Sequence, residues 1–198
     1  MALAAKGAAV FLDRDGTLIR EVNYLCSVEQ IEILPGVAQA LRLLRERGFK
    51  LVMVTNQSVI ARGGLSEAGL QDIHAQLSAQ LGADGASLDA IYYCPHHPSE
   101  GMGEYRVVCR CRKPNTGMIE RAVEDLDVDA ARSFVVGDQM TDVELAYRVG
   151  AAAIFIGRDG AAAKAARTLN VPVVDDLLQA AHWIIERAGQ SQSGAQKS

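Results

Sequence analysis

Two aspartates, separated by a single residue, stand directly after the first apolar run of the chain. Asp13 and Asp15 follow the run Ala8–Leu12, and a further carboxylate, Asp138, follows another apolar run much later. Carboxylates that converge from two strands repel one another unless a cation lies between them, and Mg²⁺ prefers oxygen ligands of this kind. A carboxylate beside such an ion can attack a phosphoryl group and carry it covalently.

Each of these pieces is weak evidence alone, because an isolated Asp-x-Asp is usually a turn or a helix cap. The order of these residues along the chain makes the whole set more specific than any one of them. Thr55 and Asn56 follow a second apolar run, and Asp142 lies four residues after Asp138. In open parallel sheets, ligands bind beyond the carboxyl ends of the strands. The sequence therefore predicts a metal-assisted phosphoryl-transfer site at that edge.

Three of the cysteines, with one histidine, have the spacing of metal ligands. Cys94 and His96 form one pair, Cys109 and Cys111 form a second, and twelve residues separate the pairs. Three thiolates and one imidazole satisfy a tetrahedral zinc ion and leave no open position, which is typical of a structural site. His97 is an alternative to His96 that spacing does not exclude.

Two other interpretations concern the cysteines. A disulfide across Cys-x-Cys would be strained, and a reducing compartment disfavours it. Cys26 stands alone and is expected to be an ordinary thiol.

Two cationic residues, Arg112 and Lys113, follow Cys111 directly, so a loop held by zinc would position both of them. These cations either form a solvated basic turn or bind an anionic substrate.

The elements that must position these groups alternate along the chain as strands and helices, the pattern of a parallel α/β sheet. Strands are predicted at 8–12, 51–54, 88–93, 133–136, 152–156 and 171–174. Helices are predicted to begin near residues 35, 66, 115 and 141, where Thr141 has capping-box spacing, and the last spans 177–188. We expect one Rossmann-like three-layer domain at 1–188 with a mostly parallel sheet, a zinc loop at 94–111 and a disordered tail at 189–198.

Composition limits the classes of protein that remain. Of 198 residues, 49% are apolar and 22% are charged, with a formal net charge of −4. This is a globular composition without the basic excess of a nucleic-acid binder. No apolar stretch has the length of a membrane span, and the first residues do not form a secretory signal. We expect a cytoplasmic monomer that acts on a small molecule, with neither nucleic acid nor membrane as partner.

Four segments resemble the motifs of the haloacid dehalogenase-like phosphatases. Phe11–Thr17 resembles motif I, Val54–Asn56 motif II, Lys113 the lysine of motif III, and Gly137–Asp142 motif IV. The resemblance implies a phosphatase in which Asp13 is the nucleophile. Asp15 would be the general acid and then the general base. Asp13, the main-chain carbonyl of Asp15, and Asp138 would hold Mg²⁺, while Thr55 and Lys113 bind the phosphoryl group.

Further segments resemble a narrower group of that family, the heptose 1,7-bisphosphate 7-phosphatases. They are Glu21–Tyr24, Thr55–Gly63, Cys94–Pro98 and Cys111–Pro114. The resemblance implies removal of the C7 phosphate from a heptose bisphosphate, on a route to lipopolysaccharide or another glycoconjugate. The residues expected to contact the substrate are Glu21, Asn23, Tyr24, Asn56, Gln57, Ser58, Arg112 and Gln139. Gln139 stands where some members of the group have lysine.

Spacing also bears on the size of the substrate. The 39 residues between Asp15 and Thr55, and the 57 between Thr55 and Lys113, leave no room for a large cap domain. The nearest alternative function is a histidinol-phosphate phosphatase, whose cationic substrate would favour acidic groups where Arg106 and Arg110 stand. An alternative of another class is a binding module that uses the zinc loop without catalysis. The set of catalytic residues argues against that alternative.

Overall fold

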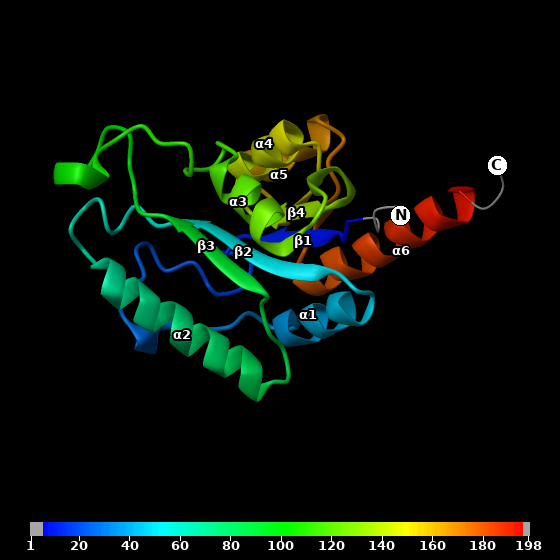
Figure 1. The fold of residues 1–198 in the computed structure, drawn as a ribbon, viewed down its shortest axis with the longest axis horizontal. Helices are drawn as coiled ribbons and strands as arrows, with labels where there is room; N and C mark the ends of the chain where they lie inside the picture. The colour runs from blue at the N-terminus through cyan, green and yellow to red at the C-terminus, as the bar shows by residue number, and fades with distance from the viewer. Residues whose placement is uncertain (1–5, 196–198) are drawn as a thin grey trace.

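A six-stranded parallel sheet forms the middle layer of the molecule, in a computed structural model that describes residues 6–195 and the side chains of residues 6–190 (Figure 1). The strands are β1 (Ala9–Leu12), β2 (Lys50–Asn56), β3 (Ala90–Cys94), β4 (Phe134–Gly137), β5 (Ala152–Ile156) and β6 (Val173–Val174). Their order is β3-β2-β1-β4-β5-β6, and every neighbouring pair is parallel. The predicted strands and the parallel sheet are confirmed.

Helices cover both faces of the sheet. They are α1 (Val37–Glu46), α2 (Glu67–Ala83), α3 (Gly117–Leu126), α4 (Met140–Val149), α5 (Ala161–Thr168) and α6 (Leu177–Ala195). Apolar side chains of α1, α2 and α6 pack on one face, and those of α3, α4 and α5 pack on the other. The predicted three-layer architecture is therefore confirmed.

The central strand β1 shows why the sheet needs both helical layers. All four of its residues are fully buried, and they alternate between the two apolar clusters. Val10 and Leu12 point to the side of α1 and α6, while Ala9 and Phe11 point to the side of α3 and α4. The chain passes from β3, on one side of β1, to β4, on the other side. In open parallel sheets, such a change of side marks the place where ligands bind, at the carboxyl ends of the strands.

Three elements differ from the predicted ones. Helix α5 was not predicted, because it has only eight residues, most of them alanine, and so short a stretch has few large apolar side chains to mark a helical period. Helix α4 begins at Met140, capped by Gln139 with Asp142, so the predicted cap at Thr141 is wrong. Helix α6 continues to Ala195 beyond the predicted end at 188, and residues 196–198 of the expected tail lie outside the described residues.

The segment between β3 and α3 is irregular apart from a 3₁₀ turn at Gly103–Tyr105, and it projects away from the sheet in Figure 1. Over residues 6–195, no additional domain is inserted between the elements of the sheet. No helix in this range combines the length and hydropathy needed to cross a bilayer.

Candidate active site

Three carboxylates meet where β1 and β4 end. Asp13 follows β1, Asp138 follows β4, and Asp142 lies in the first turn of α4. One oxygen from each lies within 4.8 Å of the others. The sequence analysis placed Asp142 near Asp138 but gave it no role. In the structure it caps α4, because its Oδ2 accepts a hydrogen bond from the main-chain nitrogen of Gln139 at 3.1 Å.

A buried lysine completes this group, which we call the carboxylate centre: Asp13, Asp138, Asp142 and Lys113. The Nζ atom of Lys113 lies 2.8 Å from Oδ1 of Asp13 and 2.7 Å from Oδ1 of Asp142. It also donates to the main-chain oxygen of Val54 at 3.0 Å. The three acceptors fix the ammonium group beside the carboxylates.

The charges of the carboxylate centre shift one another strongly. Burial lowers the pKa of Lys113, but the carboxylates of Asp13 and Asp142 outweigh it and raise the pKa above its ordinary value. Burial, with repulsion from Asp13 and Asp142, raises the pKa of Asp138 to about 7. Burial likewise raises the pKa of Asp142 to about 6, although Lys113 opposes the shift. One ammonium thus leaves the three carboxylates with excess negative charge.

The centre fits a bound Mg²⁺ ion. The Oδ1 atom of Asp138 is buried, and no described group donates a hydrogen bond to it. Gly16 leaves space beside the Asp138 carboxylate, because a Cβ atom at position 16 would lie only 2.1 Å from Oδ2 of Asp138. Hard carboxylate oxygens, excess negative charge and an unpartnered oxygen are the features that this ion requires.

Asn56 fixes the lysine from the end of β2. Its side-chain oxygen accepts from the main-chain nitrogen of Lys113 at 2.9 Å, and its amide nitrogen donates to the oxygen of the same residue at 3.1 Å. The sequence analysis expected Asn56 to contact the substrate. Because both ends of its amide bind Lys113, the structure gives Asn56 the task of connecting β2 to the loop before α3.

Asp15 lies apart from the carboxylate centre, in a network of its own. Arg14 donates to both oxygens of Asp15, and Gln57 donates to Oδ2 at 2.9 Å. Gln57 also donates to Oγ1 of Thr55 at 2.8 Å. Thr55 was predicted from motif II, and Gln57 from the resemblance to the heptose 1,7-bisphosphate 7-phosphatases, whereas no pattern in the sequence indicated that Arg14 would be buried beside them.

A small cavity of about 190 Å³ opens above Asp15. Six of the eight predicted substrate contacts line it: Glu21, Asn23, Tyr24, Asn56, Gln57 and Ser58. The other two lie elsewhere. Arg112 donates to the main-chain oxygen of His96 at 3.1 Å, and Gln139 donates to Oδ2 of Asp138 at 3.2 Å.

The loop that carries Glu21 has an unusual backbone. Asn23 and Tyr24 both have positive φ angles, 30° and 73°, which are costly for residues other than glycine. Burial, with repulsion from Asp15, raises the pKa of Glu21. Such strain and such a shifted carboxyl group are typical of functional sites.

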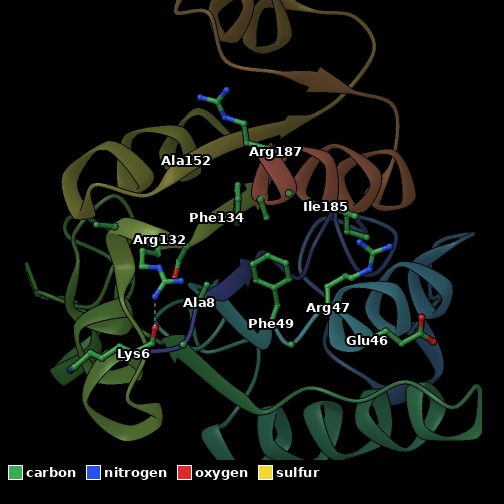
Figure 2. Close-up of a pocket in the computed structure, with 16 residues that line it drawn as sticks. Lys6, Ala8, Glu46, Arg47, Phe49, Arg132, Phe134, Ala152, Ile185 and Arg187 are labelled. Carbon is green, nitrogen blue, oxygen red and sulfur yellow. Dashed lines mark hydrogen bonds between the residues drawn. The ribbon is translucent and has the colours of Figure 1, made fainter. Parts of the chain in front are cut away.

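A larger cavity lies elsewhere in the described part of the chain. It has a volume of about 980 Å³ and lies at the amino-terminal ends of β1, β4 and β5, with Phe49 and Phe134 in its wall (Figure 2). At its rim Arg132 donates to the main-chain oxygen of Lys6 at 2.9 Å. None of the predicted site residues lines it. The predicted substrate contacts that line a cavity therefore lie around the smaller one, at the opposite end of the sheet.

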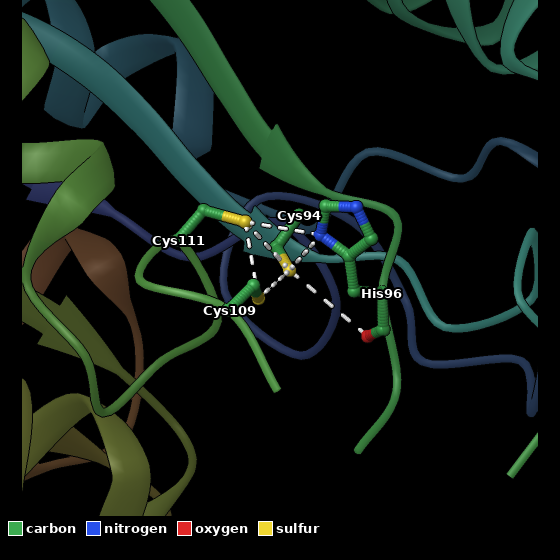
Figure 3. Close-up of side chains that lie close together, drawn as sticks. All are labelled: Cys94, His96, Cys109 and Cys111. Carbon is green, nitrogen blue, oxygen red and sulfur yellow. Dashed lines mark hydrogen bonds between the residues drawn. The ribbon is translucent and has the colours of Figure 1, made fainter. Parts of the chain in front are cut away.

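Cys94, His96, Cys109 and Cys111 form a second group, which we call the sulfur cluster. Their sulfur atoms and Nδ1 of His96 point toward one another in Figure 3. Sulfur–sulfur distances are 3.1–3.5 Å, and Nδ1 lies 3.3 Å from the sulfur of Cys111. These spacings are close to the edge of about 3.8 Å that four zinc–sulfur bonds would impose.

The competing ligand, His97, is committed to another contact. Its Nδ1 accepts hydrogen bonds from the main-chain nitrogens of Ser99 and Glu100, the latter at 2.9 Å. The structure thus places His96, and not His97, beside the three cysteines. All four cysteines are free of disulfides, and burial raises the pKa of the Cys94 thiol. A zinc ion fits this donor set and would favour the thiolate form.

The loop bearing the sulfur cluster is tied to the mouth of the small cavity. Arg62 pairs with Glu100 in that loop and lies 5.0 Å above the ring centre of Tyr24. Tyr105 donates to Glu67 of α2 at 3.0 Å. The contacts of Arg62 and Glu67 were missed by the sequence analysis, because a contact between separate segments has no characteristic spacing in the sequence.

Comparisons with known proteins agree with this geometry. A family model described as HAD-hydrolase-like matches residues 110–180. The chain is 45% identical over 155 residues to D-glycero-beta-D-manno-heptose-1,7-bisphosphate 7-phosphatase of Haemophilus ducreyi, covering 78% of this chain and 85% of that protein. The protein of the same name from Escherichia coli K12 is 37% identical over 183 residues, 92% of this chain and 91% of that one.

A solved structure extends the comparison to a liganded protein. It is D,D-heptose 1,7-bisphosphate phosphatase from B. bronchiseptica, complexed with magnesium and phosphate. Its fold matches with a TM-score of 0.77 at 31% sequence identity, covering 92% of this chain and 99% of that chain.

Proposed function

The chain belongs to the haloacid dehalogenase-like hydrolases and is a phosphatase, and we propose that it removes the C7 phosphate of D-glycero-beta-D-manno-heptose 1,7-bisphosphate. One observation carries the reaction class. Lys113 and the main-chain nitrogen of Arg14 both bind Oδ1 of Asp13, at 2.8 and 2.7 Å, so its carboxylate is fixed with the other oxygen available for attack.

The reaction runs in two halves. Asp13 attacks the phosphorus atom, the bond to the sugar oxygen breaks, and Asp15 gives that oxygen a proton as the sugar leaves. Water then attacks the phosphorus of the aspartyl-phosphate while Asp15 takes up its proton, and phosphate and the free Asp13 carboxylate result. Lys113 and Thr55 bind the phosphoryl oxygens, since charge compensation dominates phosphoryl transfer.

Two metals complete the proposal. Asp13, the main-chain carbonyl of Asp15, and Asp138 hold Mg²⁺, which supplies charge neutralisation at the transferring phosphoryl group. The sulfur cluster holds a structural zinc ion, which fixes the loop before Lys113.

Residues of the small cavity, together with two side chains outside it, select the substrate. Glu21, Asn23 and Ser58 line it with polar groups suited to sugar hydroxyls. Arg112, fixed against the main chain of His96, supplies a cation for the second phosphate, and Gln139 lies beside Asp138 where it reaches the sugar. The protein acts as a monomer on a soluble sugar phosphate in the cytoplasm.

Phosphate release tests this proposal. The substrates are both anomers of the heptose 1,7-bisphosphate, histidinol phosphate and fructose 1,6-bisphosphate, each with Mg²⁺ and with Asp13→Asn as the blank. We expect the highest kcat/KM for the beta anomer of the heptose 1,7-bisphosphate. Preference for histidinol phosphate would retain the mechanism and overturn the assigned role of Arg112. Absence of turnover on every substrate by the metal-loaded protein would favour the binding-module alternative.

A further inference from the structure

We propose that Arg14 and Gln57 are positioning residues for the general acid–base Asp15, and that His74 fixes Arg14 from behind. The inference rests on the proposed phosphatase activity. It assigns Gln57 to the catalytic step rather than to the sugar, and it gives a task to two buried side chains, Arg14 and His74, that no step of the reaction above uses.

The contacts of Arg14 carry the first part of the argument. Its side chain is only 1% exposed, although a guanidinium group is seldom fully buried. Nε and Nη2 lie 3.1 and 3.0 Å from Oδ1 of Asp15, and Nη2 lies 3.0 Å from Oδ2. Burying this charge is costly unless it is well paired, so the pairing with Asp15 is specific and rigid.

Gln57 connects this pair to the rest of the site. Its side-chain oxygen accepts from Nη2 of Arg14 at 2.8 Å, and its nitrogen donates to Oδ2 of Asp15 at 2.9 Å. The same nitrogen donates to Oγ1 of Thr55 at 2.8 Å. Because a guanidinium only donates and a carboxylate only accepts, the amide has one orientation that satisfies both.

These bonds leave Gln57 with little capacity for a sugar. The residue is 4% exposed, and both ends of its amide are engaged within the protein. Its place in the wall of the cavity therefore comes from holding Asp15 and Thr55 at a fixed separation. A role in positioning follows, in place of the substrate contact that the resemblance to the heptose 1,7-bisphosphate 7-phosphatases implied.

His74 supports Arg14 from α2. It is 6% exposed, and its Nε2 lies 3.5 Å from Nη1 of Arg14. Burial, with the neighbouring charge of Arg14, lowers the pKa of His74 to about 3, so the ring is neutral. A neutral imidazole can accept from the guanidinium, whereas a charged one would repel it.

This arrangement matters because an acid–base group must align with the oxygen it protonates. Three donor atoms on two carboxylate oxygens fix both the position and the rotation of Asp15. A displacement of about 1 Å can reduce a rate by about 100-fold. Loss of Gln57 should therefore reduce kcat while leaving substrate binding nearly unchanged.

The test is Gln57→Met in the metal-loaded protein, which keeps the side-chain length and removes every hydrogen bond of the amide. We expect kcat to fall about 100-fold with KM changed less than about threefold. A risen KM with kcat retained would make Gln57 a substrate contact and overturn the proposal. Unchanged values of both would overturn it as well.

A second measurement separates misplacement of the acid from general damage. An alkyl oxygen needs a proton to leave, whereas p-nitrophenolate does not, so Gln57→Met should lose more activity on the sugar phosphate than on p-nitrophenyl phosphate. Arg14→Lys, which retains the charge but not the two-pronged geometry, should show the same selective loss. An equal loss on both substrates by a folded variant would contradict a positioning role.

The matched control is Ser133→Ala at the far end of the sheet. Ser133 is 1% exposed, accepts from the main-chain nitrogen of Ala9 at 2.9 Å, and donates to Asp129. Its loss should lower the melting temperature without altering the ratio of the two activities. Should the wild-type protein hydrolyse simple alkyl phosphates but not the heptose bisphosphate, only the proposed substrate would fail, and the Gln57 comparison would be made on the alkyl phosphate.

Discussion

The carboxylate centre and the sulfur cluster each gather four side chains beyond the carboxyl ends of the strands, but from very different stretches of chain. Asp13 and Asp138 come from the ends of β1 and β4, with Lys113 from the loop before α3. The sulfur cluster is built entirely from the segment 94–111. The first group therefore depends on the whole sheet, and the second depends on one loop.

The two groups also differ in how their charge is balanced. The carboxylate centre contains its own cation, Lys113, in contact with Asp13 and Asp142. In the sulfur cluster, the neighbours of Cys94 are the other sulfurs and His96, and burial raises the pKa of its thiol. The carboxylate centre thus contains a positive charge within the protein, whereas a metal ion would have to supply that charge to the sulfur cluster.

The largest effect should come from the nucleophile. Asp13→Asn should reduce kcat by about 10⁴-fold or more, because no other side chain replaces a lost nucleophile. Phosphate release measures this loss. Zinc content, measured by atomic absorption, should stay equal to that of the wild-type protein, since the sulfur cluster does not contact Asp13. If Asp13→Asn also lost zinc, the carboxylate centre and the sulfur cluster would not be independent of each other.

The second largest effect is expected from removing Lys113, the cation of the carboxylate centre. Lys113→Met leaves the buried carboxylates of Asp13 and Asp142 without their ammonium partner, and should lower the free energy of unfolding by about 3–5 kcal/mol. Urea unfolding without Mg²⁺ measures it. Added Mg²⁺ should restore part of the loss, because it binds the folded state. If the stability were unchanged, Lys113 would not be what holds the carboxylates together.

The sulfur cluster is tested by removing one ligand. Cys109→Ser should lose zinc and loosen the loop before Lys113, and we expect kcat/KM to fall about 100-fold as Arg112 and Lys113 lose their alignment. Cys26→Ser, outside the cluster, is the matched control. Unchanged kinetics in a Cys109→Ser protein shown to lack zinc would disconnect the loop from catalysis.

The smallest effect concerns the neutral neighbour of Arg14. The pKa of His74 falls from 6.5 to about 3 on folding, so below pH 6.5 the unfolded chain takes up a proton that the folded protein does not. This difference should lower the free energy of unfolding by about 2 kcal/mol between pH 7 and pH 5. His74→Gln should remove that part of the pH dependence. Equal slopes for both proteins would show that His74 is protonated when folded.

Local patterns made much of the site predictable. Motif I placed Asp13 and Asp15 at the end of β1, and the two Cys/His pairs predicted the sulfur cluster, because in both cases the groups lie close in sequence. The strands were predictable for a similar reason. Their apolar runs are continuous, since both faces of the sheet are covered.

What the sequence did not reveal depends on which way a side chain turns. Asn56 and Gln57 were both expected at the sugar, yet one binds the main chain of Lys113 and the other binds Arg14 and Asp15. Their partners are fixed only when β1, β2 and the loop before α3 have come together. The same holds for Asp142, whose contact with Lys113 joins the first turn of α4 to the loop before α3.

The position of β1 in the sheet has a consequence for how the protein is made. β1 is synthesised before β4, which is one of its two neighbours in the sheet, where Phe134 pairs with Val10. At about 5–20 residues per second, a ribosome needs roughly 6 to 25 seconds to add the 124 residues from Val10 to Phe134. During that time the edge of β1 that β4 later covers has unpaired main-chain N–H and C=O groups, beside side chains that are all apolar. The surroundings of Asp13, the proposed nucleophile, are thus completed only after β4 has emerged.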